Sequence, residues 1–540
     1  MSLRTLLLLL LVTTADLVAQ EGGVPPLEIG DVTVVGRRTL ILPKARKGEV
    51  FDTSRYVLPA GDTLLFGPRV SNFEGPAGPL PGYREFTPPV RGLIELSLGS
   101  YLSPRALLRG EYAERMFDIG GEFDYRSTAG HIDSAEASGL RFLVHGGAIV
   151  GDTLPPLRRF RVSGEFEYQG ESYFLYGNDR SPFDRSRAMT GIAVALRSQE
   201  AHPIAYDARL RYSRTSVDDR GVDTIVTAAA TEPSFDLAIA ADVAELVRGG
   251  FEFSFSTSSL RYNAPTQTTS DVALTGSVEW TPAPLFYLSA GLLYGSGKQS
   301  DSGSTSIFLP RIGGRYALDE SLTLFGAFAP ELRPALYRKL LRAAPYVDRE
   351  ITLRPEEVPV RLVGGIRYAD GSITLEGRGF YESAENTPLV VADTTGAGRL
   401  RYEYVASTTA GVEGSMVMAP RDDLLISAEA RIMATKADTL NRGLPMRPTM
   451  DLRGDAMWKA TTEIEIRASL LYQSEQRVRL IDEETIGTRF LLGIGGLYQI
   501  MPNLDVIADV SNLLGVTYDS WENYSAPGFE FRAGIRYRVP

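Results

Sequence analysis

The feature that most constrains the fold is a strict alternation of apolar and charged residues at the end of the chain. From Phe529 to Val539 every second side chain is apolar. The intervening positions are Glu530, Arg532, Gly534, Arg536 and Arg538. Because side chains on a β-strand alternate between two faces, this segment predicts a strand with one apolar and one charged face. A soluble sheet would bury the apolar face, whereas a membrane barrel would present it to lipid and keep the charges in its lumen.

The same alternation recurs along the chain in segments of about ten residues, the length of strand that crosses a membrane at a tilt. The clearest segments are 159–168, 251–255, 286–294, 361–368 and 463–472. A single alternating segment is weak support for a strand, but repetition to the end of the chain favours an all-β fold. We therefore predict a transmembrane, antiparallel, up-and-down β-barrel that begins near Leu93.

Turn residues between these segments indicate how the strands are connected. Tight turns are expected at Pro155-Pro156, His202-Pro203, Ala244-Glu245, Ala283-Pro284, Asp319-Glu320, Asp370-Gly371, Arg421-Asp422, Thr461-Thr462 and Pro502-Asn503. Longer polar loops are expected at 170–187, 218–232, 329–359 and 435–445. Short turns at one end and long loops at the other are typical of outer-membrane barrels. This scheme predicts about 22 strands, an even number that places both termini in the periplasm.

The N-terminal part of the chain differs from the rest. Arg4, the apolar run 6–12 and a cleavage site before Gln20 predict a signal peptide over residues 1–19. Residues 20–92 are rich in proline and glycine and are expected to form little regular structure. The predicted domains are therefore 1–19 (signal peptide), 20–92 (periplasmic or lumenal segment) and 93–540 (barrel).

Composition excludes several kinds of site. The formal net charge of -11 argues against a nucleic-acid partner. The absence of cysteine excludes thiolate metal sites, thiol nucleophiles and a lipoprotein anchor. The three histidines, His131, His145 and His202, lack metal-ligand spacing, and no serine lies in a hydrolase motif. We therefore expect no catalytic residue, no metal, no cofactor and no enzyme, although a hydrolase site within a barrel stays an alternative.

Charged and glycine-rich positions on the predicted strands have two interpretations. Inward-facing arginines could line a path for an anionic solute, or they could pair with carboxylates in a solvated wall, which is the favoured interpretation because lumen positions are generally polar. These arginines are Arg159, Arg161, Arg209, Arg211, Arg367, Arg467, Arg536 and Arg538. The glycines at 364–365 and 493–496 lie on predicted strands, where glycine more often permits curvature than phosphate binding.

The C-terminal segment resembles the end of TonB-dependent outer-membrane receptors. In that family an Asn-Leu-Phe-like triplet and a tyrosine precede an Ala-Pro-Gly-type turn, as 512–514, Tyr518 and 526–528 do here. Gly534, Tyr537 and Val539 have the spacing of the family's Gly-x-x-Tyr-x-Phe signal, which the barrel-assembly machinery recognises. Two positions depart from the pattern. Phe529 replaces the usual arginine, and the chain ends in Val539-Pro540 instead of an aromatic residue.

Two further stretches carry the resemblance. Residues 345–346, 353–356 and 365–368 are similar to a Leu-x-Pro-Glu motif and glycine-rich strand near the middle of the family's barrel. A segment near the mature N-terminus resembles the Ton box, through which the family binds TonB. It comprises Asp31, Val32, Thr33, Val34 and Val35. The resemblance implies a plug in the lumen, but residues 20–92 are shorter than the family's plug and carry no plug signature.

Three functions agree with these features. The favoured one is a receptor-like barrel in the outer-membrane lipid, which transports a solute and whose residues 20–92 close the lumen. The second is a structural barrel filled by a lumenal or surface partner protein. The third is a passive channel or a barrel enzyme. The resemblance names TonB and the assembly machinery as partners, and the sequence gives no indication of the solute.

Overall fold

The computed structural model describes residues 90–539, except 115, 152–158, 178–182, 200–202, 222–224, 263–265, 284, 301–302, 393–399 and 481–482. The predicted signal peptide, the Ton-box-like residues 31–35 and nearly all of segment 20–92 lie outside the described residues. Within the described part, no helix has both the length and the apolar character needed to cross a membrane.

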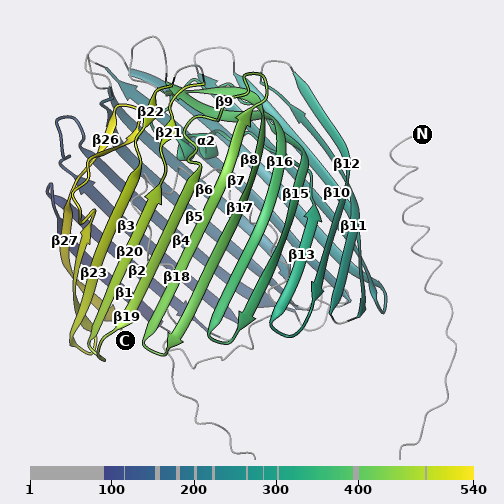
Figure 1. The fold of residues 1–540 in the computed structure, drawn as a ribbon, viewed down its shortest axis with the longest axis horizontal. Helices are drawn as coiled ribbons and strands as arrows, with labels where there is room; N and C mark the ends of the chain where they lie inside the picture. The colour runs from purple at the N-terminus through teal and green to yellow at the C-terminus, as the bar shows by residue number, and fades with distance from the viewer. Residues whose placement is uncertain are drawn as a thin grey trace, which may run out of the picture. The chain divides into compact units, whose positions relative to one another are not determined.

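The described residues form a closed antiparallel barrel (Figure 1). Its sheet contains 23 segments, but β13 and β14 pair with successive parts of one neighbour, β15, and occupy one position in the wall, so the barrel has 22 strands. The wall strands are β1 (Val90–Gly99), β2 (Ser103–Ala113), β3 (Phe117–Thr128), β4 (Ala137–Val150), β5 (Phe160–Leu175), β6 (Phe183–Ser198), β7 (Ile204–Arg220), β8 (Ile225–Ala244), β9 (Val247–Tyr262), β10 (Gln267–Ala283), β11 (Phe286–Lys298), β12 (Ser304–Ala317), β13 (Leu322–Phe328), β14 (Glu331–Arg333), β15 (Glu356–Asp370), β16 (Ile373–Ala392), β17 (Leu400–Arg421), β18 (Leu424–Ala437), β19 (Met450–Lys459), β20 (Ile464–Gln473), β23 (Arg489–Met501), β24 (Leu504–Ser511) and β27 (Glu530–Val539). The predicted all-β barrel of about 22 strands is confirmed, and its first strand begins at Val90, slightly before the predicted Leu93.

The first and last strands close the barrel. β27 pairs with β1 in continuous register, from Gly92 opposite Val539 to Gly99 opposite Arg532. On the lumen face of this seam, the Arg536 guanidinium lies 2.8 Å from the Glu95 carboxylate, and both side chains are buried. The alternation predicted for the last strand is therefore confirmed.

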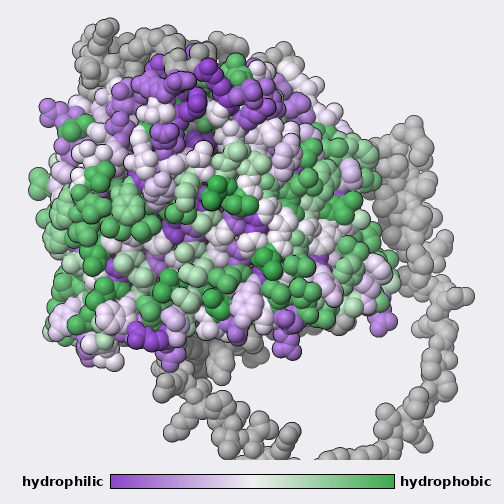
Figure 2. Space-filling model, viewed as in Figure 1, coloured by the Kyte–Doolittle hydropathy of each residue, from purple (hydrophilic) through white to green (hydrophobic). Residues whose placement is uncertain are grey.

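The outer surface of the barrel is apolar. Figure 2 shows hydrophobic side chains spread over the middle of the visible wall, while hydrophilic ones gather at the end that carries the longer loops. The apolar side chains that alternate with lumen-facing residues are unusually exposed, for example Leu98 (54%), Leu292 (51%) and Ile535 (49%). Exposing so many large apolar groups to water is unfavourable by about 25 cal/mol per Å². Lipid covers this surface in a transmembrane barrel.

The two ends of the barrel differ as expected. The predicted turns at 244–245, 319–320, 370–371, 421–422, 461–462 and 502–503 are confirmed as connections between neighbouring strands. Those at Pro155-Pro156, His202-Pro203 and Ala283-Pro284 lie wholly or partly outside the described residues. Since Gly92 pairs with Val539, β1 begins and β27 ends at the same, short-turn end.

Two of the predicted long loops are wrong. Most of 170–187 belongs to β5 and β6, and most of 218–232 belongs to β7 and β8. The polar residues that suggested loops instead alternate along strands of 16 to 20 residues, longer than the roughly 9–11 residues that one crossing needs. These strands extend past the lipid-facing band and surround the mouth of the barrel. The loop predicted at 435–445 is largely confirmed, because β18 ends at Ala437 and β19 begins at Met450.

Candidate functional site

Residues 334–355, between β14 and β15, form a structured cap at the long-loop end of the barrel. The sequence predicted a polar loop here, but the segment contains the helix α2 (Tyr337–Ala343). Tyr337, Leu341 and Ala344 recur at helical spacing and are fully buried. A helix of seven residues has little stability of its own, so the tertiary contacts of this apolar face hold it in place.

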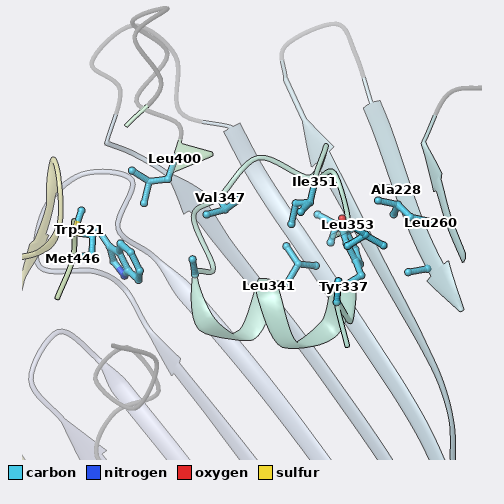
Figure 3. Close-up of a cluster of buried hydrophobic side chains, with 14 of the residues drawn as sticks. Ala228, Leu260, Tyr337, Leu341, Val347, Ile351, Leu353, Leu400, Met446 and Trp521 are labelled. Carbon is cyan, nitrogen blue, oxygen red and sulfur yellow. The ribbon is translucent and has the colours of Figure 1, made fainter. Parts of the chain in front are cut away.

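The apolar face of the cap belongs to a buried core inside the mouth of the barrel. In Figure 3 the side chains of Leu341 and Tyr337 point from α2 toward Ile351 and Leu353. Around them lie buried side chains from β6 to β9 and from the loops that follow β18, β20 and β24. These surrounding residues include Met189, Val217, Ala228, Leu260, Met446, Val478 and Trp521. Each large apolar side chain buried here contributes roughly 1.5–3 kcal/mol, so this core holds the cap and the loops together.

A buried ion triad fixes the cap to the wall. Asp219 on β7 accepts hydrogen bonds at 2.7 and 2.9 Å from Arg185 on β6, and one at 2.5 Å from Arg349 of the cap. The remaining amino group of Arg185 donates to the backbone carbonyls of Val347, at 2.6 Å, and Pro345, at 3.0 Å. Because all three charged side chains are buried, removing one partner would leave an uncompensated charge away from water.

Further hydrogen bonds attach the cap around the circumference of the mouth. Arg187 on β6 donates to the carbonyl of Leu341 at 2.8 Å, next to the C-terminus of α2 where a cation is favourable. On the opposite side, the Tyr402 hydroxyl on β17 donates to the Leu340 carbonyl at 2.7 Å. The Leu353 amide donates to the Ser300 hydroxyl at 3.1 Å. The cap therefore spans the mouth between several parts of the wall.

Stacked tyrosines join the cap to the last long loop. The rings of Tyr346 and Tyr524 are stacked, with centroids 3.8 Å apart. Tyr176, which follows β5, packs edge-on against both rings. Burial raises the pKa of Tyr346 well above its ordinary value, so its hydroxyl stays neutral. The cap and this loop therefore pack against each other inside the mouth.

The other face of α2 carries three cations, Arg338, Lys339 and Arg342, which we call the cationic face. At 100° per residue Lys339 lies opposite Tyr337 and Leu341, and Arg338 and Arg342 lie on either side of it. They meet side chains of the lumen wall. Arg338 Nε is 3.6 Å from a Glu232 carboxylate oxygen, and Arg342 donates to the Gln169 amide oxygen at 3.3 Å.

The lumen wall is polar and largely paired, as the favoured interpretation of the inward arginines predicted. Arg161, Arg467, Arg536 and Arg538 each form an ion pair with an aspartate or glutamate. A cavity of about 230 Å³ on the wall of β16–β19 is bordered by paired charges of both signs. Arg209, Arg211 and Arg367 differ, because none of them has a carboxylate oxygen within 4.0 Å among the described residues, although Arg209 and Arg211 act electrostatically on Asp236.

The predicted assembly signal lies on the strand that closes the barrel. The side chains of Tyr537 and Val539 are exposed on the outer wall, whereas Gly534 faces the lumen directly opposite Ser97 of β1. A Cβ atom at Gly534 would collide with the Leu96 carbonyl oxygen and with Ser97. The close approach of β1 and β27 thus requires glycine here, and recognition by the assembly machinery stays a prediction.

The histidines do not form a site within the described residues. His145 lies opposite Glu165 on the lumen face, in phase with Arg141 as predicted. His131 is 3.2 Å from the Ser525 hydroxyl in the loops, and His202 is outside the described residues. In that part of the chain no three His, Cys, Asp or Glu side chains are grouped so that they could hold a metal.

Solved structures with this fold are known. The chain matches the apoprotein form of the FrpB iron transporter from Neisseria meningitidis, with a TM-score of 0.67 and 13% identity over 84% of this chain and 81% of that one. It matches the ferric yersiniabactin uptake receptor FyuA from Yersinia pestis, with a TM-score of 0.65 and 12% identity over 84% and 80%. It also matches the copper transporter OprC, with a TM-score of 0.62 and 13% identity over 83% and 80%.

No family model matches the chain. No curated protein matches it either. At this level of identity the solved structures establish the fold alone, which is the fold that the C-terminal resemblance implied.

Proposed function

We propose that this chain is an outer-membrane transporter of the TonB-dependent receptor type, in which the cap is the outer gate of the lumen. The observation that carries the proposal is the cap itself. A lipid-facing barrel whose mouth is filled by a buried core and fixed by an ion triad is built to stay closed until it is opened. Gated transport accounts for both the wide barrel and its closed end.

The cap disfavours the passive channel. Constitutive pores keep a water-filled path between their ends. Here, apolar residues from the cap, the wall and three other loops meet inside the mouth. Opening would expose these side chains and separate Arg349 from Asp219, so a free-energy input is required.

In this proposal the N-terminal segment receives the free energy for opening by binding TonB. Both ends of the barrel sheet lie at the short-turn end, so the chain enters β1 on the same side as the end of β27. We place that side in the periplasm, where residues 31–35 would bind TonB and the remainder of 20–89 would close the inner side of the lumen. The similar solved structures are described as an iron transporter, a copper transporter and a ferric yersiniabactin uptake receptor, which supports solute import.

Disulfide cross-linking tests the energy coupling. The chain contains no cysteine, so Thr33→Cys introduces a single thiol within the Ton-box-like segment. We expect this variant to cross-link to a cysteine-bearing periplasmic domain of TonB in the outer membrane. A second substitution, Val34→Pro, removes a backbone N–H and should abolish the cross-link.

The control thiol is placed at Ser304, at the long-loop end of β12, which should not react with TonB. Equal cross-linking of Thr33→Cys with and without Val34→Pro would contradict the coupling. A native pull-down that instead recovers a stoichiometric lumenal partner would favour the structural barrel.

A further inference from the structure

A buried carboxylate on β10 lies beneath the cap without a partner. Asp271 is only 6% exposed, and neither of its carboxylate oxygens has a hydrogen-bond partner among the described residues. It faces the lumen, directly opposite Ser256 on β9 and Gly297 on β11. On the outer face of β10 the apolar side chains end at Val272, and Ser270 beyond it is polar. Asp271 therefore lies in the mouth, past the lipid-facing band.

The end of the cap covers this carboxylate. A Cβ atom added at Gly297 would lie 2.7 Å from Asp271 Oδ1 and 2.7 Å from Pro355 Cγ, so these two side chains meet over the glycine. Two residues before Pro355, the Leu353 amide donates to the Ser300 hydroxyl, and the Leu353 carbonyl accepts from the Ser300 amide, both at 3.1 Å. The last residues of the cap are thus attached at the end of β11, beside Asp271, and shield it from water.

No cation compensates this carboxylate at close range. Among the charged groups of the described residues, only the Lys339 ammonium of α2 acts electrostatically on Asp271, and it does not reach hydrogen-bonding distance. The charged side chains of the other neighbouring elements pair with one another, Glu252 of β9 with Arg311 of β12, Arg333 of β14 with Glu356 and Glu382, and Glu232 of β8 with Arg338. Burial raises the pKa of the Asp271 carboxyl to about 7, against smaller lowering effects of Ser256 and Lys339.

We propose that Asp271 is a proton-binding site that regulates the cap, in which protonation keeps the end of the cap closed and ionisation loosens it. This proposal rests on the proposed gate function of the cap and adds the signal to which the gate responds. A buried, unpaired charge is strongly unfavourable, so an ionised Asp271 favours any movement of Leu353 and Pro355 that admits water. The neutral carboxyl packs beneath Pro355 without this penalty.

The direction of the effect follows from the two states of the cap. In the closed cap the pKa of Asp271 is raised, whereas contact with water on opening returns it toward the ordinary aspartate value of about 3.9. Below that value both states are protonated, and this group favours neither. As pH rises from about 4 to about 7, the open state loses its proton first and opening becomes progressively easier, and above about 7 the effect is complete.

Hydrogen exchange of the cap tests the site in the full-length protein in detergent. Amide exchange of peptides from residues 336–355 is followed by mass spectrometry and corrected for its intrinsic pH dependence with an unfolded reference. In the parent, protection of the cap should fall at least tenfold between about pH 5 and about pH 8, since each unit of pKa difference corresponds to tenfold. Asp271→Asn resembles the protonated form and should keep the cap protected at both values.

Two further variants make the result specific to this carboxylate. Lys339→Gln removes the only ammonium that favours ionised Asp271, so the pH at which protection falls should move upward. Asp438→Asn neutralises an exposed carboxylate at the same end of the barrel and should leave the pH dependence of the parent unchanged.

Protection of the cap that is independent of pH in the parent, or that falls equally in the parent and in Asp271→Asn, overturns the proposal. Hydrogen exchange reports the cap itself and requires neither TonB nor a solute. A cap that responds to pH through Asp271 in a protein that does not cross-link to TonB would therefore support the proton site while contradicting the proposed energy coupling.

Discussion

Among single residues, Asp219 has the largest role in holding the cap, because it is the only carboxylate that both Arg185 and Arg349 contact in the described structure. Asp219→Ala leaves two guanidinium groups buried beside one another. We expect a loss of roughly 3–5 kcal/mol, the usual cost of removing one partner from a buried charge cluster. Thermal unfolding in detergent, followed by the change in gel mobility of unheated samples, measures it.

The matched control for this prediction is Asp207→Ala. Asp207 pairs with Arg197 on an exposed part of the same strand pair, where ion pairs contribute about 0–1 kcal/mol. Equal destabilisation by the two substitutions would show that the triad has no special role in stability.

Gly534 gives a second prediction at the residue scale. A side chain here collides with the backbone of β1, so Gly534→Ala should weaken the seam between β1 and β27 and lower the yield of assembled barrel. Gly276→Ala is the control, because a Cβ atom at Gly276 meets nothing within 4 Å. The amounts of folded protein in outer-membrane fractions are compared, and similar yields would argue against the steric requirement.

Among the elements, the cap gives a prediction about access to the lumen. Leu341 is fully buried between α2 and the wall, so Leu341→Asp places a charge in the core of the mouth and should open the cap. A single cysteine at Ser234, on the lumen face of β8, reports the opening through labelling by a membrane-impermeant maleimide in whole cells. Labelling should be slow in the parent and at least severalfold faster with Leu341→Asp. Leu440→Asp, at an exposed loop position, should leave the labelling slow.

The elements also separate what the sequence could predict from what it could not. Strands such as 286–294 can be predicted from neighbouring residues, because alternation alone indicates that one face meets lipid and the other water. The cap depends on contacts with residues far away in the chain, for example Arg185 with Val347. The signal within it was the helical spacing of Leu336, Tyr337, Leu340 and Leu341, which a search for period-two alternation overlooks. For a related reason the sequence predicts strands shorter than β7 and β8, because the polar residues of these strands face a packed mouth instead of open solvent.

For the whole molecule, the proposed function places one barrier at the long-loop end, made by the cap, and a second at the other end, made by residues 20–89. Two barriers in series conduct only when both are open, because the closed one sets the resistance. The deletion of 24–89, which leaves β1 intact, should therefore keep a low conductance in planar bilayers, and Leu341→Asp alone should also keep it low. Their combination should give a large, steady conductance typical of an open lumen of this strand number. A large conductance from the deletion alone would mean that the cap does not close the mouth, and one from Leu341→Asp alone would mean that residues 20–89 do not obstruct the lumen.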